Sequence, residues 1–181
     1  MIPVGYMAKR VSLRSEWLNV DRIKDIYSVS HCISNSFTDD FTFWKHNGYW
    51  FYDSPEIIRQ LAQENNIDLT GTAIFYYEAY ESEFDNDTGE WKSFRPDTAF
   101  TTAVLPPLNK TLEGHDVVTF GGFSVECSPL SCNSVATEVE TNSHCLLDSF
   151  EQAKQLIEDG AFSNTEPGRQ RILAVYSTDW S

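Results

Sequence analysis

The stretch TAIFYYEAYESEFDNDTGEW, residues 72–91, decides the predicted fold of this chain. Its first half is rich in β-branched and aromatic residues, which favour strands. Asp85 then begins a tight turn, and Gly89 occupies a position that favours a positive φ, a pattern typical of a hairpin with a bulge. We therefore expect a long strand that folds back at this turn. A calcium loop is the weaker alternative, because the glycine falls one place too early for the EF-hand pattern.

Two other stretches predict helices. In residues 53–66, Ser54 can cap and Pro55 suits the first helical position. In residues 148–160, Ser149 begins a capping box and an apolar stripe follows it. A third helix is expected within residues 15–30. Further strands are predicted at residues 5–13, 49–53, 90–95, 99–105, 116–126 and 171–177.

These elements predict an α+β fold with a mostly antiparallel sheet and two or three helices packed on one face. The strands and helices alternate too irregularly for a doubly wound parallel sheet. Pro106-Pro107 indicates a surface loop at residues 104–116 rather than a domain boundary. We expect a single domain over residues 1–181. The aromatic cluster in residues 41–52 is interpreted mainly as core, with Trp50 and Tyr52 on inward positions.

Charge is the most informative bulk property of the chain. There are 27 acidic and 13 basic residues, a net charge of −14, and residues 26–168 alone carry −17. Such a field repels nucleic acid and anionic membranes and attracts basic proteins. The ordinary alternative is an acidic surface that only maintains solubility. No apolar run reaches the roughly 18 residues of a membrane span, and the N-terminus lacks a secretory pattern, so a cytoplasmic protein is expected.

The hairpin combines tyrosine, tryptophan and carboxylates, which suit a docking face for a basic protein. The alternative is a solvated hairpin whose charges discourage aggregation at the sheet edge. The predicted partner-binding residues are Tyr80, Glu81, Glu83, Asp85, Asp87, Glu90 and Trp91, with Asp39 and Asp40 as a second patch.

A different hypothesis concerns the cysteines. Cys127 and Cys132, with His144 and Cys145 further along, could assemble a tetrahedral zinc site, with Cys32 as an additional thiol. The gap of four residues is loose for a zinc knuckle, and free cysteines are more often buried apolar residues. A disulfide or redox pair is a third interpretation, disfavoured in a reducing compartment.

No motif of nucleophilic, phosphate-binding, dinucleotide-binding or metalloprotease chemistry is present, so an enzyme is the less favoured class. The combination of an acidic, aromatic-rich single domain without a catalytic signature resembles bacterial immunity proteins and anti-defence inhibitors in composition. That resemblance implies a protein–protein inhibitor without a cofactor, which occludes the basic surface of a toxin or nuclease. The alternative is a zinc- or cysteine-dependent enzyme centred on the cysteines.

Overall fold

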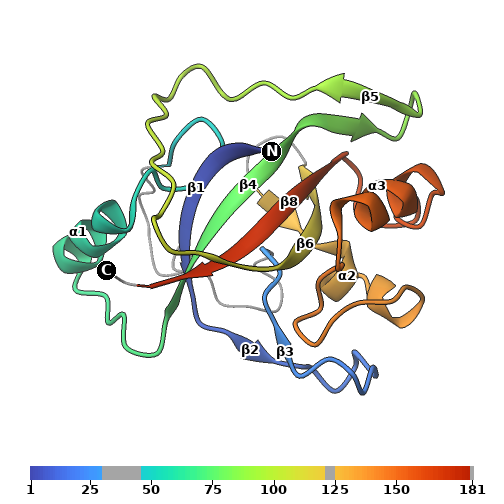
Figure 1. Cartoon of the computed structure of the whole chain (residues 1–181), viewed down its shortest axis with the longest axis horizontal. Coiled ribbons are helices and arrows are strands. Elements are labelled where there is room, and N and C mark those ends of the chain that lie inside the picture. The colour runs from blue at the N-terminus through green and yellow to red at the C-terminus, as the bar shows by residue number, and fades with distance from the viewer. Residues whose placement is uncertain (30–45, 121–124, 180–181) are drawn as a thin grey trace.

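An antiparallel sheet forms the centre of the molecule (Figure 1). The structure is a computed structural model that describes residues 1–29, 46–120 and 125–179. The strand order across the sheet is β1-β4-β8-β6-β7, and β5 pairs with the C-terminal end of β4. The strands are β1 (Ile2–Lys9), β4 (Ala73–Asp85), β5 (Glu90–Ser93), β6 (Thr111–Phe120), β7 (Val125–Cys127) and β8 (Arg169–Thr178).

Helices pack on this sheet, which confirms the predicted α+β class. They are α1 (Pro55–Asn65), α2 (Pro129–Cys132) and α3 (Phe150–Glu158), with a 3-10 turn η2 (Val135–Thr137). Ile58 of α1 shares an apolar cluster with Tyr76 of β4, and Ile157 of α3 shares another with Ile172 of β8. Tyr76 pairs with Tyr176, which lies four residues from Ile172 and therefore on the same side of β8. Helices α1 and α3 thus cover the same face of the sheet.

The ends of the two long helices follow their predicted signals. Pro55 occupies the first turn of α1, and Asn66 ends that helix in the left-handed region at φ 56°. The Ser149 hydroxyl accepts a hydrogen bond from the Gln152 amide, as the capping box predicts. Ser54 is the N-cap of α1, but its side chain makes no capping bond to the helix.

The predicted helix within residues 15–30 is wrong. In its place the two short strands β2 (Ser12–Leu13) and β3 (Asp25–Ile26) pair, and the chain between them turns irregularly. Leu18, Val20 and Ile23 are buried without a helix, because tertiary contacts hold the segment. The Arg22 guanidinium, for example, donates to the carbonyls of Ala136, Val139 and Thr141.

Several predicted strands are absent from the structure or have other bounds there. Residues 49–53 do not form a strand, since the chain turns at Gly48 and Tyr49 and Tyr52 makes only an isolated bridge to Tyr6. The Asn47 side chain holds this turn, because it accepts from the amides of Tyr49 and Phe51 and donates to the Val4 carbonyl. Residues 99–105 run as an irregular, partly exposed segment, and β6 begins at Thr111, inside the predicted loop. The short helix α2 was not predicted.

The aromatic cluster is only partly buried. Phe51 and Tyr52 are 1% and 0% exposed, so these two are core, while Trp50 is half-buried. Residues 41–45 of the cluster lie outside the described residues. The turn held by Asn47 thus places the adjacent rings of Trp50 and Phe51 in different environments, one half-buried and the other in the core.

Candidate functional site

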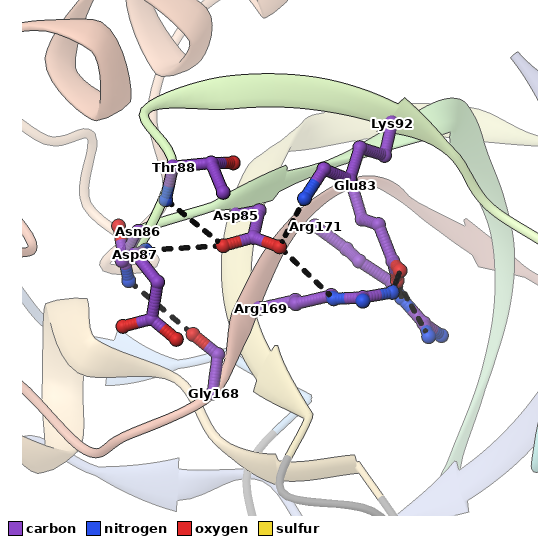
Figure 2. A network of polar contacts seen from close by, with 9 residues as sticks. All are labelled: Glu83, Asp85, Asn86, Asp87, Thr88, Lys92, Gly168, Arg169 and Arg171. Atoms are coloured by element: carbon purple, nitrogen blue, oxygen red, sulfur yellow. Dashed lines mark hydrogen bonds and ion pairs between the residues drawn. The ribbon is translucent and has the colours of Figure 1, made fainter.

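The β4–β5 hairpin has the predicted turn. Asp85 Oδ1 accepts from the amides of Asp87 at 3.0 Å and Thr88 at 3.2 Å, and the Gly89 amide donates to the Asp85 carbonyl at 2.8 Å. Gly89 has φ 68°, a conformation that favours glycine. Asp85 therefore organises the turn as well as carrying charge (Figure 2).

One face of the hairpin is aromatic and packs on helix α3. The Tyr80 ring lies 4.8 Å from the Phe150 ring and 5.5 Å from the Trp91 ring, both edge-on. The Trp91 indole donates to Glu158 of α3 at 2.8 Å. These contacts tie Tyr80 and Trp91, two predicted partner-binding residues, to the body of the protein.

The other face carries a network of ion pairs between β4 and β8 (Figure 2). Glu83, only 4% exposed, accepts from Arg169 and from Arg171, whose Nε and Nη2 lie at 3.0 and 2.9 Å. Asp85 accepts from Lys92 at 2.7 Å and lies 3.7 Å from Arg169 Nε. The negative charges of Glu83 and Asp85 are therefore balanced within the molecule.

The pKa shifts agree with this geometry. The hydrogen bond from Lys92 lowers the pKa of the Asp85 carboxyl, and the bond to Glu83 raises the pKa of Arg169. Burial lowers the pKa of Arg171 to about 10, although Glu83 opposes this, and the group stays protonated at neutral pH. Arg171 also stacks on Phe94, with its guanidinium carbon 3.4 Å from the ring centre.

A pocket of about 1020 Å³ opens beside this network. Trp50, the hairpin turn, residues 94–97 and the loop at 163–169 line it. Its lining includes five carboxylates against three guanidinium groups, a net charge of −2. These are Glu83, Asp85, Asp87, Asp97 and Glu166, and Arg95, Arg169 and Arg171.

Three of these carboxylates stand apart from the ion-pair network. Asp87, Asp97 and Glu166 are exposed, and within the described residues Asp87 and Glu166 have no side-chain hydrogen bond or ion pair. Asp97 accepts one bond, from the Ala99 amide at 2.9 Å. The pocket rim therefore carries negative charge that the molecule itself does not balance.

The remaining predicted hairpin residues are exposed. Glu81 and Glu90 lie on the hairpin outside the pocket lining, and Asp87 is the predicted residue that is both exposed and on the rim. Asp39 and Asp40 lie outside the described residues. Sequence reasoning missed Asp97, Glu166 and the β8 arginines, whose only local signal is the alternation of Arg169 and Arg171 on one side of a strand.

Trp50 reaches the pocket through an unusual backbone. Its φ is 69°, a left-handed conformation that costs a bulky residue about 1–3 kcal/mol. Asn47, 3% exposed, holds the turn through its side-chain bonds to Val4, Tyr49 and Phe51. The indole stacks on His46 at 3.8 Å and forms part of the pocket wall.

The residues predicted for zinc do not come together as a metal site. Within residues 1–29, 46–120 and 125–179, no group of three or more His, Cys, Asp or Glu side chains could hold a metal ion. The His144 ring instead lies 2.5 Å from Asp25 and stacks on Tyr27 at 4.1 Å. Cys145 is fully buried, which raises the pKa of its thiol to about 12.

The other two thiols make local contacts or remain partly exposed. Cys127 is buried and lies 3.8 Å from the Asn133 amide oxygen, and Cys132 is half-buried on α2. Cys32, the additional thiol of the zinc hypothesis, lies outside the described residues. Among the described residues, the four zinc candidates therefore do not share one site.

A second buried polar group lies away from the pocket. Asp116 is 0% exposed, and its Oδ2 accepts from the Val29 amide at 2.8 Å and the Ser128 hydroxyl at 2.6 Å. Its Oδ1 has no hydrogen-bond partner. Burial raises the pKa of Asp116 to about 6, although the two hydrogen bonds oppose the shift.

Comparison of the chain with protein-family models, with curated proteins and with solved structures finds no significant match. Among the described residues, no helix has the length and apolar character that crossing a membrane requires.

Proposed function

We propose that this protein binds a basic protein partner through the pocket beside the β4–β5 hairpin. The observation that supports the proposal is the set of exposed carboxylates on the pocket rim, Asp87, Asp97 and Glu166, on a chain of net charge −14. In this proposal the protein is an inhibitor of the immunity or anti-defence type and acts in the cytoplasm. Its partner is a basic effector such as a toxin or nuclease.

The charged side chains of the pocket form two groups with different roles. Glu83 and Asp85 pair with Arg169, Arg171 and Lys92 and hold β4, β5 and β8 together. These pairs fix the walls of the pocket before a partner arrives, which reduces the entropy lost on binding. The rim carboxylates then provide the attraction.

The mechanism is occlusion of a cationic surface. The negative field of the whole chain speeds the encounter with a basic partner, and the rim carboxylates orient the final contact. A nuclease uses lysine and arginine side chains to hold the phosphates of its substrate. When the rim carboxylates occupy those side chains, the substrate is excluded.

Fluorescence anisotropy with labelled octalysine and octaarginine peptides tests the proposal. The test variant combines Asp87→Lys, Asp97→Lys and Glu166→Lys. The matched control combines Glu138→Lys, Glu140→Lys and Asp148→Lys, which are exposed acids outside the pocket and change the net charge equally.

We expect the rim variant to bind both peptides about tenfold more weakly or worse at low salt, because three ion pairs of up to about 1 kcal/mol each are lost. The control should lose less than about threefold, through the change in overall field alone. Equal losses in the two variants would show that only net charge matters, and the pocket would then have no role.

A further inference from the structure

We infer that the pocket receives an arginine-bearing segment of the partner and discriminates arginine from lysine. This inference rests on the proposed function, since it specifies the cationic group that the same pocket takes. It draws on the volume of the cavity, the aromatic residues in its wall and the distribution of its unbalanced charge.

The cavity is larger than one side chain. A volume of about 1020 Å³ is at the upper end of the range of small-molecule sites, so it can admit several residues of an extended segment. Its lining comes from four separate parts of the chain, and the rim carboxylates come from three of them. Asp87 lies in the hairpin turn, Asp97 follows β5 and Glu166 precedes β8.

Aromatic side chains form part of the wall. Trp50 and Phe94 both line the pocket, where His46 stacks on one face of Trp50 at 3.8 Å and the Arg171 guanidinium stacks on one face of Phe94 at 3.4 Å. A guanidinium group is planar and weakly hydrated, and it stacks on aromatic faces. A lysine ammonium is compact and strongly hydrated, so it loses more hydration on entering a walled cavity and gains less from the rings.

The cations already in the pocket do not prevent entry of another. Arg169, Arg171 and Lys92 are paired with Glu83 and Asp85, so two of these three positive charges are compensated before binding. Arg95 is the remaining cation of the lining, against the three rim carboxylates. A carboxylate can accept two parallel bonds from the guanidinium fork, which an ammonium cannot donate in the same geometry.

The test compares labelled octaarginine, octalysine and octacitrulline peptides on the full-length protein. Citrulline keeps the planar shape of arginine but has no charge. We expect octaarginine to bind at least fivefold more tightly than octalysine at equal ionic strength, and octacitrulline to bind at least tenfold more weakly than octaarginine.

Two substitutions at the wall sharpen this result. Trp50→Leu should reduce the preference for arginine to less than twofold, whereas Trp50→Phe, which retains an aromatic ring, should preserve it. Trp17→Leu, which removes a 52% exposed tryptophan outside the pocket lining, is the matched control and should change nothing. Circular dichroism tests whether each variant is folded. If Trp50→Leu does not fold, the ratio of the octaarginine and octalysine affinities of wild type decides whether the pocket prefers arginine.

The outcomes separate the two proposals. Binding of both cationic peptides with affinities that differ by less than fivefold overturns the arginine preference and leaves the basic-partner proposal in place. Failure of both peptides to bind wild type overturns both. A strong preference that survives Trp50→Leu in folded protein also overturns the inference, because the aromatic wall would then not be its source.

Discussion

Replacing Glu83 with glutamine is expected to destabilise the protein by about 3 kcal/mol, because Arg171 then stays buried without its counter-ion. The Glu83 side chain is 5% exposed and that of Arg171 is 12% exposed. Removing one partner of such a buried pair typically costs about 3–5 kcal/mol. The value here lies at the lower end, since Arg171 keeps its stack on Phe94 and glutamine still offers one acceptor. Arg169 is 52% exposed and regains water, so its lost pair adds at most about 1 kcal/mol.

Urea unfolding followed by tryptophan fluorescence measures this loss. The matched control is Glu81→Gln, which removes an exposed carboxylate two residues away on the same strand and should change stability by less than about 0.5 kcal/mol. For a chain of 181 residues the Glu83→Gln loss corresponds to a fall in Tm of roughly 6–12 °C.

Adding Arg171→Met to Glu83→Gln should recover part of the lost stability, because the unpaired charge is removed and the methionine fills similar space. The reasoning is refuted if Glu83→Gln and Glu81→Gln unfold at the same urea concentration. It is also refuted if the double variant is no more stable than Glu83→Gln alone.

Three further predictions concern the body of the fold. The pKa of Asp116 is raised from 3.8 to about 6, so the protonated side chain is favoured in the folded protein. The contribution of this residue to folding stability is therefore greatest below about pH 4 and is lost as pH rises through 6. The stability of wild type relative to Asp116→Asn should therefore fall by about 2 kcal/mol between pH 4.5 and 7.5, and urea midpoints that shift equally in both proteins would contradict this. Ser149→Ala should cost about 1 kcal/mol in urea unfolding and Ser54→Ala clearly less, because only Ser149 accepts a capping bond. Gly114→Ala should destabilise the protein by at least about 2 kcal/mol more than Gly71→Ala in thermal unfolding. A Cβ added at Gly114 would lie 2.7 Å from Leu146 Cβ, whereas a Cβ added at Gly71 meets open space. Equal losses in the two variants would exclude the clash.

The parts of the fold that local chemistry specifies could be predicted from the sequence. The hairpin follows from Asp85 and Gly89, and helix α3 follows from the capping box at Ser149. Residues 15–30 were misassigned because their apolar spacing fits a helix, while the bonds from Arg22 to carbonyls more than 110 residues away hold them in another form. Helix propensity depends on the local sequence and takes no account of such long-range contacts.

The candidate site was predictable only in part, for a related reason. The sequence places acids and aromatic rings together on the hairpin, and Asp87 does lie exposed on the pocket rim. The partners of Glu83 come from a strand 86 and 88 residues away, so nothing near it predicts that its charge is balanced. Asp97 and Glu166 are isolated acids in the sequence, and only the tertiary fold brings them to the same cavity.

The pairing of β4 with β8 therefore determines which carboxylates are available to a partner. Glu83 pairs with Arg171 just after an irregularity in β4 between Ala79 and Glu83. A slip of β8 by one residue would turn Arg171 to the face covered by helices and leave Glu83 buried without a cation. The cost of that uncompensated charge opposes the slip, so the ion pairs help to specify the strand register. The same register leaves Asp87 and Glu166 without partners among the described residues. The stability of the sheet and the unbalanced charge of the pocket rim thus depend on the same strand pairing, and a change in that pairing would alter both.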